Sequence, residues 1–138
     1  MRILFISPRV EKRGFQWAMY PPLGLMTLSA VLKKEGHEVV FLDGAIEDLN
    51  AETLADIVKE YQPGLTGLPV NVMQLNQARL YAECLKRACP DIPLVAGGPL
   101  ISAVSRDVFE FLPGIDYAVF SEGEYALPAL VRHLQGQE

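Results

Sequence analysis

Two glycine-containing turns carry the residues of this sequence best suited to hold a ligand. Gly97-Gly98-Pro99 follows a short apolar run, and its glycines let the backbone approach a bound molecule before proline fixes the exit. Ser121 to Glu124 follows the next apolar run and carries two carboxylates. Structural explanations also exist: a tight turn into a helix for the first segment, and a helix N-terminus that favours acidic groups for the second. Which explanation holds depends on the elements that position the two turns.

Metal and nucleophile chemistry lack suitable clusters. His37 is expected between a helix and a strand at the amino edge of a sheet, and His133 in the last helix. Cys84 and Cys89 are about 140° apart around a helix and cannot pair within it, and two cysteines are too few for a disulfide scaffold. We expect Cys89 in the core and Cys84 partly exposed. The sequence predicts no catalytic residue and no metal-ligating side chain.

Several familiar site motifs are absent. The sequence has no Gly-x-Gly-x-x-Gly, no phosphate-binding Gly-x-x-x-x-Gly-Lys-Ser/Thr and no Gly-x-Ser-x-Gly nucleophile turn. The Ser7-Pro8-Arg9 segment is not a hydroxyl-rich flavin phosphate loop. A phospho-receiver would need an aspartate after the third strand, where Pro69 stands. The motifs favour a binding domain over a complete enzyme.

Length and composition set the class. The chain has 138 residues, half of them hydrophobic, which suits one domain with a sizeable core. Twelve basic and 17 acidic residues give a net charge of −5, which argues against a nucleic-acid partner. The apolar runs are too short to span a bilayer, and the N-terminus does not resemble a signal peptide. We therefore expect a soluble, reduced, cytoplasmic domain without a membrane partner.

Apolar β-rich runs alternate five times with helical periodicity. The predicted strands cover residues 3–7, 38–43, 64–70, 92–96 and 117–120. The first helix starts at Pro21-Pro22 and stops near Gly36, and the second is capped by Asn50. The remaining predicted helices cover residues 74–89, 102–112, with Val104, Val108 and Phe109 inward, and 124–135.

Continuous hydrophobic strands between amphipathic helices are typical of a parallel sheet covered on both faces. The predicted fold is α/β, a flavodoxin-like (Rossmann-like) doubly wound sheet of five parallel strands in the order 2-1-3-4-5. In such sheets ligands bind outside the carboxyl ends of the strands. The loops expected at that edge cover residues 7–20, 44–49, 69–73, 97–101 and 121–124.

Five segments in order form a recognisable pattern: residues 21–25 (PPLGL), 35–43 (EGHEVVFLD), 63–68 (PGLTGL), 90–99 (PDIPLVAGGP) and 113–124 (PGIDYAVFSEGE). This pattern resembles the N-terminal cobalamin (B12)-binding domain of B12-dependent radical S-adenosylmethionine enzymes. That group includes the anaerobic magnesium-protoporphyrin ester cyclases and many methyltransferases. The resemblance covers nearly the whole chain.

The resemblance implies cobalamin at the carboxyl edge, with its nucleotide tail entering beside Gly97-Gly98-Pro99. A large residue at position 98 would then crowd the tail and weaken binding more than folding. Phe15, Trp17 and Tyr20 would face the corrin or a partner domain, or pack on the first helix. The implied cofactor-binding residues are Ser7, Pro8, Arg9, Pro69, Val70, Asn71, Val72, Met73, Gly97, Gly98, Pro99, Glu122, Gly123 and Glu124.

Three departures refine that expectation. The Asp-x-His-x-x-Gly of better-known cobalamin domains is absent, which implies base-off cobalamin with no histidine on cobalt. Pro69 replaces the serine or threonine that often ends the third strand, so a hydroxyl that could bond the tail is missing. The Cys-x-x-x-Cys-x-x-Cys of the radical enzymes is also absent.

The missing cysteine motif means that residues 1–138 are not catalytically complete alone. We expect one domain, the N-terminal part of a longer enzyme whose C-terminal barrel binds S-adenosylmethionine and an iron–sulfur cluster. One alternative is a cofactor-free docking or interaction domain of the same fold. Another is a small-molecule enzyme that uses Glu122 or Glu124 for acid–base chemistry.

Overall fold

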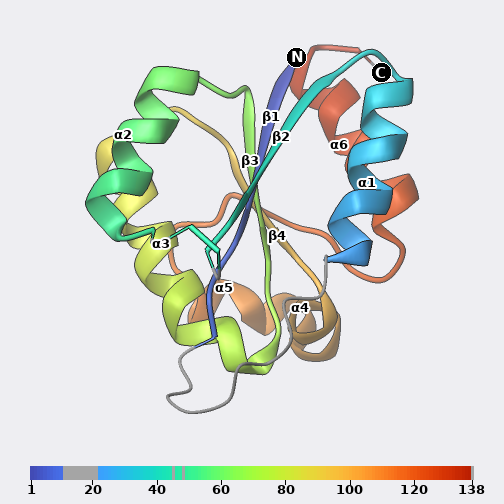
Figure 1. The fold of residues 1–138 in the computed structure, drawn as a ribbon. Helices are drawn as coiled ribbons and strands as arrows, with labels where there is room; N and C mark the ends of the chain where they lie inside the picture. Colours follow the sequence, from blue (N-terminus) through green and yellow to red (C-terminus); the bar gives the residue numbers. More distant parts are fainter. Residues whose placement is uncertain (11–21, 45, 48, 138) are drawn as a thin grey trace.

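Five parallel strands form one sheet in the order β2-β1-β3-β4-β5 (Figure 1). The structure, a computed structural model, describes residues 1–10, 22–44, 46–47 and 49–137. This order and the parallel pairing confirm the predicted flavodoxin-like fold. The strands are β1 (Arg2–Ser7), β2 (Glu38–Asp43), β3 (Leu65–Pro69), β4 (Leu94–Gly97) and β5 (Tyr117–Ala118).

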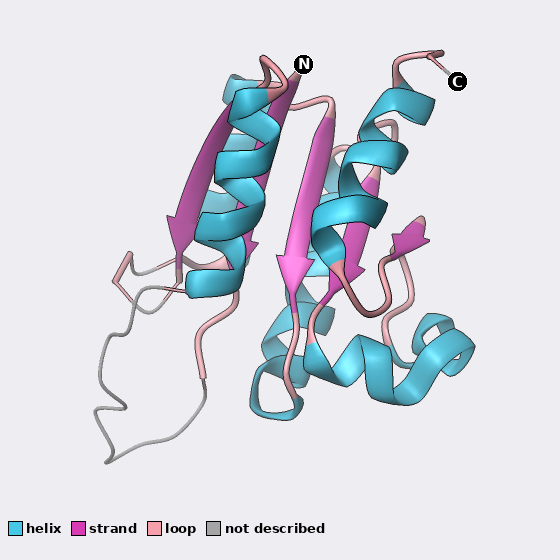
Figure 2. Cartoon of the chain, turned by 90° about the vertical axis from the view of Figure 1, so that its right-hand side faces the viewer, coloured by secondary structure: helices cyan, strands magenta, loops and turns pink. Residues whose placement is uncertain are grey.

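Helices cover both faces of the sheet (Figures 1 and 2). They are α1 (Leu23–Lys34), α2 (Ala51–Tyr61), α3 (Leu75–Ala88), α4 (Pro99–Val104), α5 (Val108–Phe111) and α6 (Gly123–Leu134), with 3-10 turns η1 (Val72–Gln74) and η2 (Ser105–Asp107). Helices α1 and α6 pack together on one face, and α2 and α3 on the other. Asn50 caps α2 as predicted, because its Oδ1 accepts from the Thr53 amide at 2.9 Å.

Two predicted elements differ from the structure. The helix expected over 102–112 begins earlier, with Pro99 at its first position, and is broken at Ser105, whose φ is +53°. Because of that break, Phe109 is 46% exposed, so its predicted inward orientation is wrong, whereas Val108 is fully buried. The strand expected over 117–120 is shorter and ends at Ala118, and Ser121, with φ +61°, then turns the chain towards α6.

The core has two parts because successive strand residues point to opposite faces. On the α2–α3 face, Leu4, Leu68 and Ala96 pack with Tyr81, whose hydroxyl donates to the Leu49 carbonyl at 2.9 Å. On the α1–α6 face, a smaller cluster joins strand residues to the two helices. Its buried members are Ile3, Phe5, Leu25, Leu32, Val39, Leu65, Val95, Leu127 and Val131.

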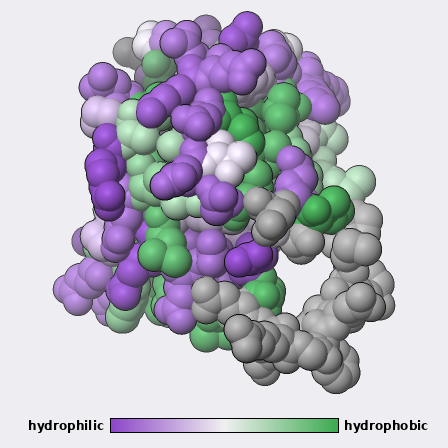
Figure 3. All heavy atoms as spheres, turned by 60° about the vertical axis from the view of Figure 1, so that its left-hand side comes forward, coloured by the Kyte–Doolittle hydropathy of each residue, from purple (hydrophilic) through white to green (hydrophobic). Residues whose placement is uncertain are grey.

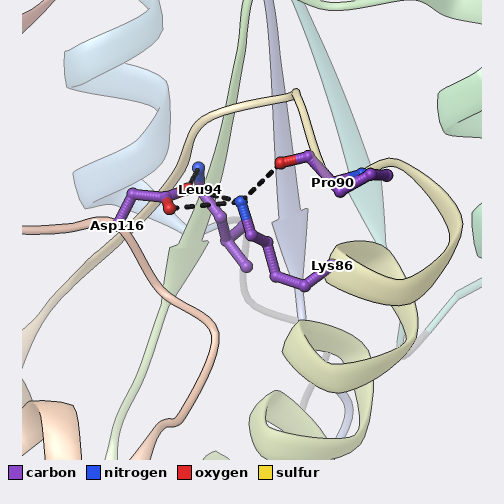
Figure 4. Close-up of polar contacts among 4 residues, drawn as sticks. All are labelled: Lys86, Pro90, Leu94 and Asp116. Carbon is purple, nitrogen blue, oxygen red and sulfur yellow. Dashed lines mark hydrogen bonds and ion pairs between the residues drawn. The ribbon is translucent and has the colours of Figure 1, made fainter.

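Side chains and backbone together fix the amino edge of the sheet (Figure 4). The Lys86 ammonium donates to the Pro90 carbonyl at 2.9 Å and pairs with the Asp116 carboxylate at 3.0 Å. The same carboxylate accepts from the Leu94 amide at 2.8 Å. These bonds tie the end of α3, the start of β4 and the approach to β5 into one unit.

The surface drawn in Figure 3 is mainly hydrophilic, with hydrophobic side chains in scattered patches. None of the helices in the described part of the chain has the length and apolar character needed to cross a membrane.

Candidate functional site

A pocket of about 380 Å³ opens at the carboxyl edge, on the α1–α6 face of the sheet. Its floor comes from the strands β1, β3 and β4, and its walls from the N-terminal parts of α1, α4 and α6 and from the segment after β5. The floor residues are Phe5, Gly67, Leu68, Pro69, Val95 and Gly97; the wall residues are Pro22 to Leu25, Leu28, Gly98, Pro99, Val119, Ser121 to Glu124 and Leu127. The topology therefore places the hollow where doubly wound sheets bind ligands.

The pocket exists because glycines leave out side chains. A Cβ at Gly97 would meet nothing closer than Val119, at 3.8 Å, so the space above this strand end is open. A Cβ at Gly24, in the first turn of α1, would have no neighbour within 4 Å. Gly67 serves the floor differently, because a Cβ there would lie 2.7 Å from Cδ1 of Phe5. The aromatic ring of Phe5 therefore occupies the place above Gly67 and limits the depth of the pocket.

Gly98 has a structural role in addition to lining the pocket. Its φ is +109°, and a Cβ would lie 2.9 Å from the Val70 carbonyl oxygen and 3.0 Å from its nitrogen. The Val70 amide donates to the Gly97 carbonyl at 2.8 Å, and the Val70 carbonyl accepts from the Leu100 amide at 3.2 Å. Any side chain at position 98 therefore strains the junction of β3 and β4 before it reaches a ligand.

The β5–α6 turn forms the mouth of the pocket on one side. The Ser121 amide donates to the Ser102 hydroxyl at 3.0 Å, which holds the turn against α4. A Cβ at Gly123 would lie 3.1 Å from Cδ2 of Leu28, so this glycine lets α6 approach α1 closely. Glu122 and Glu124 stand at the rim; Glu122 is exposed and Glu124 half-buried.

Seven of the predicted site residues line this pocket: Pro69, Gly97, Gly98, Pro99, Glu122, Gly123 and Glu124. The other seven, which are Ser7, Pro8, Arg9, Val70, Asn71, Val72 and Met73, lie at the same edge outside it. Their roles in cofactor binding stay predictions. Phe15, Trp17 and Tyr20 lie outside the described residues.

Local bonds organise the two loops beside the pocket. The Asn71 side chain accepts from the amides of Met73, at 2.9 Å, and Gln74, at 3.1 Å, and so caps η1. The Gln74 side-chain amide donates to the Pro8 carbonyl at 2.6 Å, which links the loops after β1 and β3. Val72 is 72% exposed on this ordered turn, so an apolar side chain is presented to solvent at the carboxyl edge.

Sequence reasoning missed the apolar lining: Phe5, Leu25, Leu28, Val95, Val119 and Leu127. Leu25 and Leu28 have the spacing typical of one apolar face of a helix, but this pattern does not show that one end of that face borders an open space. The missed glycines, Gly24 and Gly67, were present in the segments that carry the family resemblance. The sequence feature that could have indicated the pocket was a glycine at a strand end together with another glycine in the facing helical turn.

The titratable groups with shifted pKa values lie away from the pocket. Desolvation and the nearby N-terminal ammonium lower the pKa of His37, whose Nδ1 lies 3.3 Å from that ammonium at the amino edge. Burial raises the pKa of the Cys89 thiol, and the Cys84 thiol donates to the Ala51 carbonyl at 2.9 Å. Both cysteines are half-buried, and Cys89 packs against the α2–α3 core. Within the described residues, no group of three histidine, cysteine or acidic side chains could hold a metal ion.

Comparison with known families identifies the family of this chain. The family described as B12 binding domain matches residues 18–131. This chain belongs to the B12-binding domain family. The match includes α1, most of α6 and every strand except β1.

Relatives of this B12-binding domain include an uncharacterized methyltransferase of Pyrococcus horikoshii, 30% identical over 141 residues. An anaerobic magnesium-protoporphyrin IX monomethyl ester cyclase of Cereibacter sphaeroides is 30% identical over 134 residues. These matches cover 100% and 96% of this chain but only 30% and 22% of the two relatives. The B12-binding domain therefore spans less than a third of the length of either protein.

Solved structures confirm the fold of the B12-binding domain. OxsB, a cobalamin-dependent S-adenosylmethionine radical enzyme solved with aqua-cobalamin and S-adenosylmethionine bound, matches with a TM-score of 0.72 and 22% identity. That match covers 99% of this chain and 19% of OxsB. A CheY-like protein of Pseudomonas aeruginosa matches with a TM-score of 0.67 and 20% identity, over 100% of this chain and 97% of that protein. At such identities the likeness concerns the fold alone.

Proposed function

We propose that this chain binds cobalamin at the carboxyl edge of its sheet, as the cofactor module of a radical S-adenosylmethionine methyltransferase or cyclase. The observation that carries the proposal is the glycine-lined apolar pocket between α1 and α6 in a chain of the B12-binding domain family. The relatives named as a methyltransferase and as cyclases support the enzyme class.

The pocket residues suit the nucleotide tail of cobalamin, which ends in a flat and largely apolar aromatic base. Phe5, Leu25 and Val95 offer apolar surface, and the open space above Gly97 leaves room for a ring. Around the mouth, Leu23 is 74% and Tyr125 81% exposed, so large apolar side chains are available to the corrin. Bound cobalamin would supply cobalt chemistry, such as methyl transfer, beside these residues.

The proposal assigns no histidine of this chain to cobalt and therefore expects base-off cobalamin. The sequence has two histidines. His37 lies between α1 and β2, and His133 lies in the last turn of α6. Both positions are at the amino edge of the sheet, opposite to the pocket mouth. The pocket residues would hold the tail base, which would then be unavailable to cobalt.

The reaction is assigned to a longer protein, because this chain spans under a third of its relatives. A C-terminal radical S-adenosylmethionine barrel, with its iron–sulfur cluster, would face the carboxyl edge and complete the corrin site. This chain would contribute binding, orientation and exclusion of water from one side of the cofactor.

The test is to incubate the chain with hydroxocobalamin, remove free cofactor by gel filtration and record the visible spectrum. We expect cobalamin to comigrate with the protein and to show a base-off spectrum. A base-on spectrum would contradict the tail placement. A colourless, well-folded protein peak at high cofactor concentration would favour the docking-domain alternative, in which the fold is kept without the cofactor.

A further inference from the structure

The interior of the pocket offers a ligand almost no hydrogen-bonding side chains. The polar side chains among the described lining residues are Ser121, Glu122 and Glu124. All three belong to the β5–α6 turn at the mouth, where Ser121 and Glu122 are exposed. The deeper lining consists of aliphatic, aromatic and glycine residues. A ligand group that enters the pocket fully therefore lies beyond the polar side chains, which remain at the rim.

The backbone at the floor does not replace those missing partners. Gly67 lies between Phe5 and Val95 in the parallel sheet. Peptide groups within such a ladder point along the plane of the sheet towards neighbouring strands, and not out of its face. Phe5, only 2% exposed, closes the floor above Gly67. An inserted ring thus meets carbon on the floor and on the α1 wall.

We infer that this pocket selects among cobamides by the chemistry of the tail base, accepting a benzimidazole and discriminating against a purine. The inference rests on the proposed cobalamin function and deepens it. Dimethylbenzimidazole presents methyl groups and carbon to the wall. Adenine presents an amine donor and additional ring-nitrogen acceptors, which lose water on entry and gain no side-chain partner from the deeper lining.

Leu28 is the side chain best placed to set this selectivity. It lies in α1, lines the pocket and approaches Gly123 of α6, so it stands where the two walls meet. It is half-buried, so a polar side chain of similar length is tolerated there. Leu130 of α6 offers a matched control, because it is a half-buried leucine packed on the same core and does not line the pocket.

The experiment titrates the 138-residue chain with cobalamin, with the cobamide that carries adenine as its tail base, and with cobinamide, which lacks the nucleotide tail. Binding is read from the visible spectrum and from comigration on gel filtration. We expect cobalamin to bind about tenfold or more tightly than the adenine cobamide, since each unpartnered polar group weakens burial. Cobinamide should bind more weakly than cobalamin.

The variant Leu28→Gln adds an amide that can bond a purine. It should reduce the preference for cobalamin at least about threefold, whereas Leu130→Gln should leave the preference unchanged. Thermal unfolding followed by circular dichroism checks that both variants fold. If Leu28→Gln is unfolded, Val119→Thr adds a hydroxyl to the lining with nearly the same shape and should shift the preference in the same direction.

The outcomes separate the two proposals. Equal affinity for cobalamin and the adenine cobamide would overturn the selectivity and leave cobalamin binding intact. Equal affinity for cobalamin and cobinamide would show that the tail stays outside the pocket, which also overturns it. Binding of none of the three by folded protein would refute the proposed function itself, and the selectivity with it.

Discussion

The two edges of the sheet differ in how their turns and strand ends are held in place. At the amino edge, charged side chains bond one another and the backbone: Lys86 and Asp116 fix the start of β4, and Arg2 bonds the Tyr61 carbonyl and pairs with Glu38. At the carboxyl edge, turns are built from glycine and proline, and the space between α1 and α6 is open. One edge is completed by its own residues, and the other leaves apolar surface available.

The distribution of exposed apolar side chains supports the same contrast. Leu23, Ile46, Val72 and Tyr125, each more than 60% exposed, all belong to segments at the carboxyl edge. Scattered exposed apolar residues are ordinary, whereas several at one edge of a sheet are typical of a binding surface. This fold therefore places charged side-chain bonds at one end of the strands and a pocket with exposed apolar side chains at the other.

Filling the pocket should have the largest effect. Leucine at position 97 would project into the open space beside Val119 and take the place of the ligand, without a positive φ to strain the strand. We expect Gly97→Leu to weaken cobalamin binding about a hundredfold, which corresponds to about 3 kcal/mol of steric conflict. Titration by visible spectroscopy measures it. Unchanged affinity in a folded variant would show that the pocket is not the tail site.

The junction of β3 and β4 should show the next largest effect, on folding. Gly98→Ala puts a Cβ 2.9 Å from the Val70 carbonyl oxygen at φ +109°, so we expect a loss of about 2–3 kcal/mol in the free energy of unfolding. Gly24→Ala is the control, because its Cβ meets nothing and alanine favours helix by about 0.5–1 kcal/mol. Urea denaturation measures both. A neutral Gly98→Ala would remove the structural role assigned here.

The fold could be predicted from the sequence because the patterns that determine it are local. Hydrophobic periodicity distinguishes strands from helices, and parallel topology follows from their alternation. The Asn50 cap was readable in the same way, since a cap is a bond between near neighbours. The break at Ser105 was not readable, because a positive φ at serine depends on surrounding packing and has no residue signature.

The candidate site could be predicted only in part, for a related physical reason. Gly97, Gly98 and Gly123 mark positions that lack a side chain, and the structure places all three at the pocket. In the sequence, Phe5 and Leu28 cannot be distinguished from residues of the hydrophobic core, because both are apolar residues within a strand or helix pattern. Whether such a residue fills a core or borders a hollow depends on what stands opposite, such as Gly67 below Phe5. That relation between distant residues cannot be read from either segment alone.

A change at the amino edge should sharpen the contrast by affecting stability alone. Asp116→Ala leaves the Leu94 amide without its acceptor and the Lys86 ammonium without its ion pair. We expect a loss of about 1–2 kcal/mol in unfolding free energy, reduced from a buried value because both side chains are partly exposed. Asp116→Asn should lose less, because its side-chain oxygen can still accept from Leu94. Cobalamin affinity of the folded variants should stay unchanged; a loss of affinity would mean that the two edges are coupled.

The smallest effect concerns pH, again at the amino edge. The folded protein lowers the pKa of His37 from 6.5, first by desolvation and then by the N-terminal ammonium beside it. A lowered pKa means that the folded state binds this proton less readily than the unfolded state. The stabilising contribution is therefore present above pH 6.5 and is lost as the pH falls below it. We expect the urea midpoint to decrease between pH 7.5 and 5.5 by less in His37→Gln than in the parent chain, with His133→Gln as the control that keeps the parent's decrease. An identical decrease in all three proteins would show that this contact does not report on the folding of the amino edge.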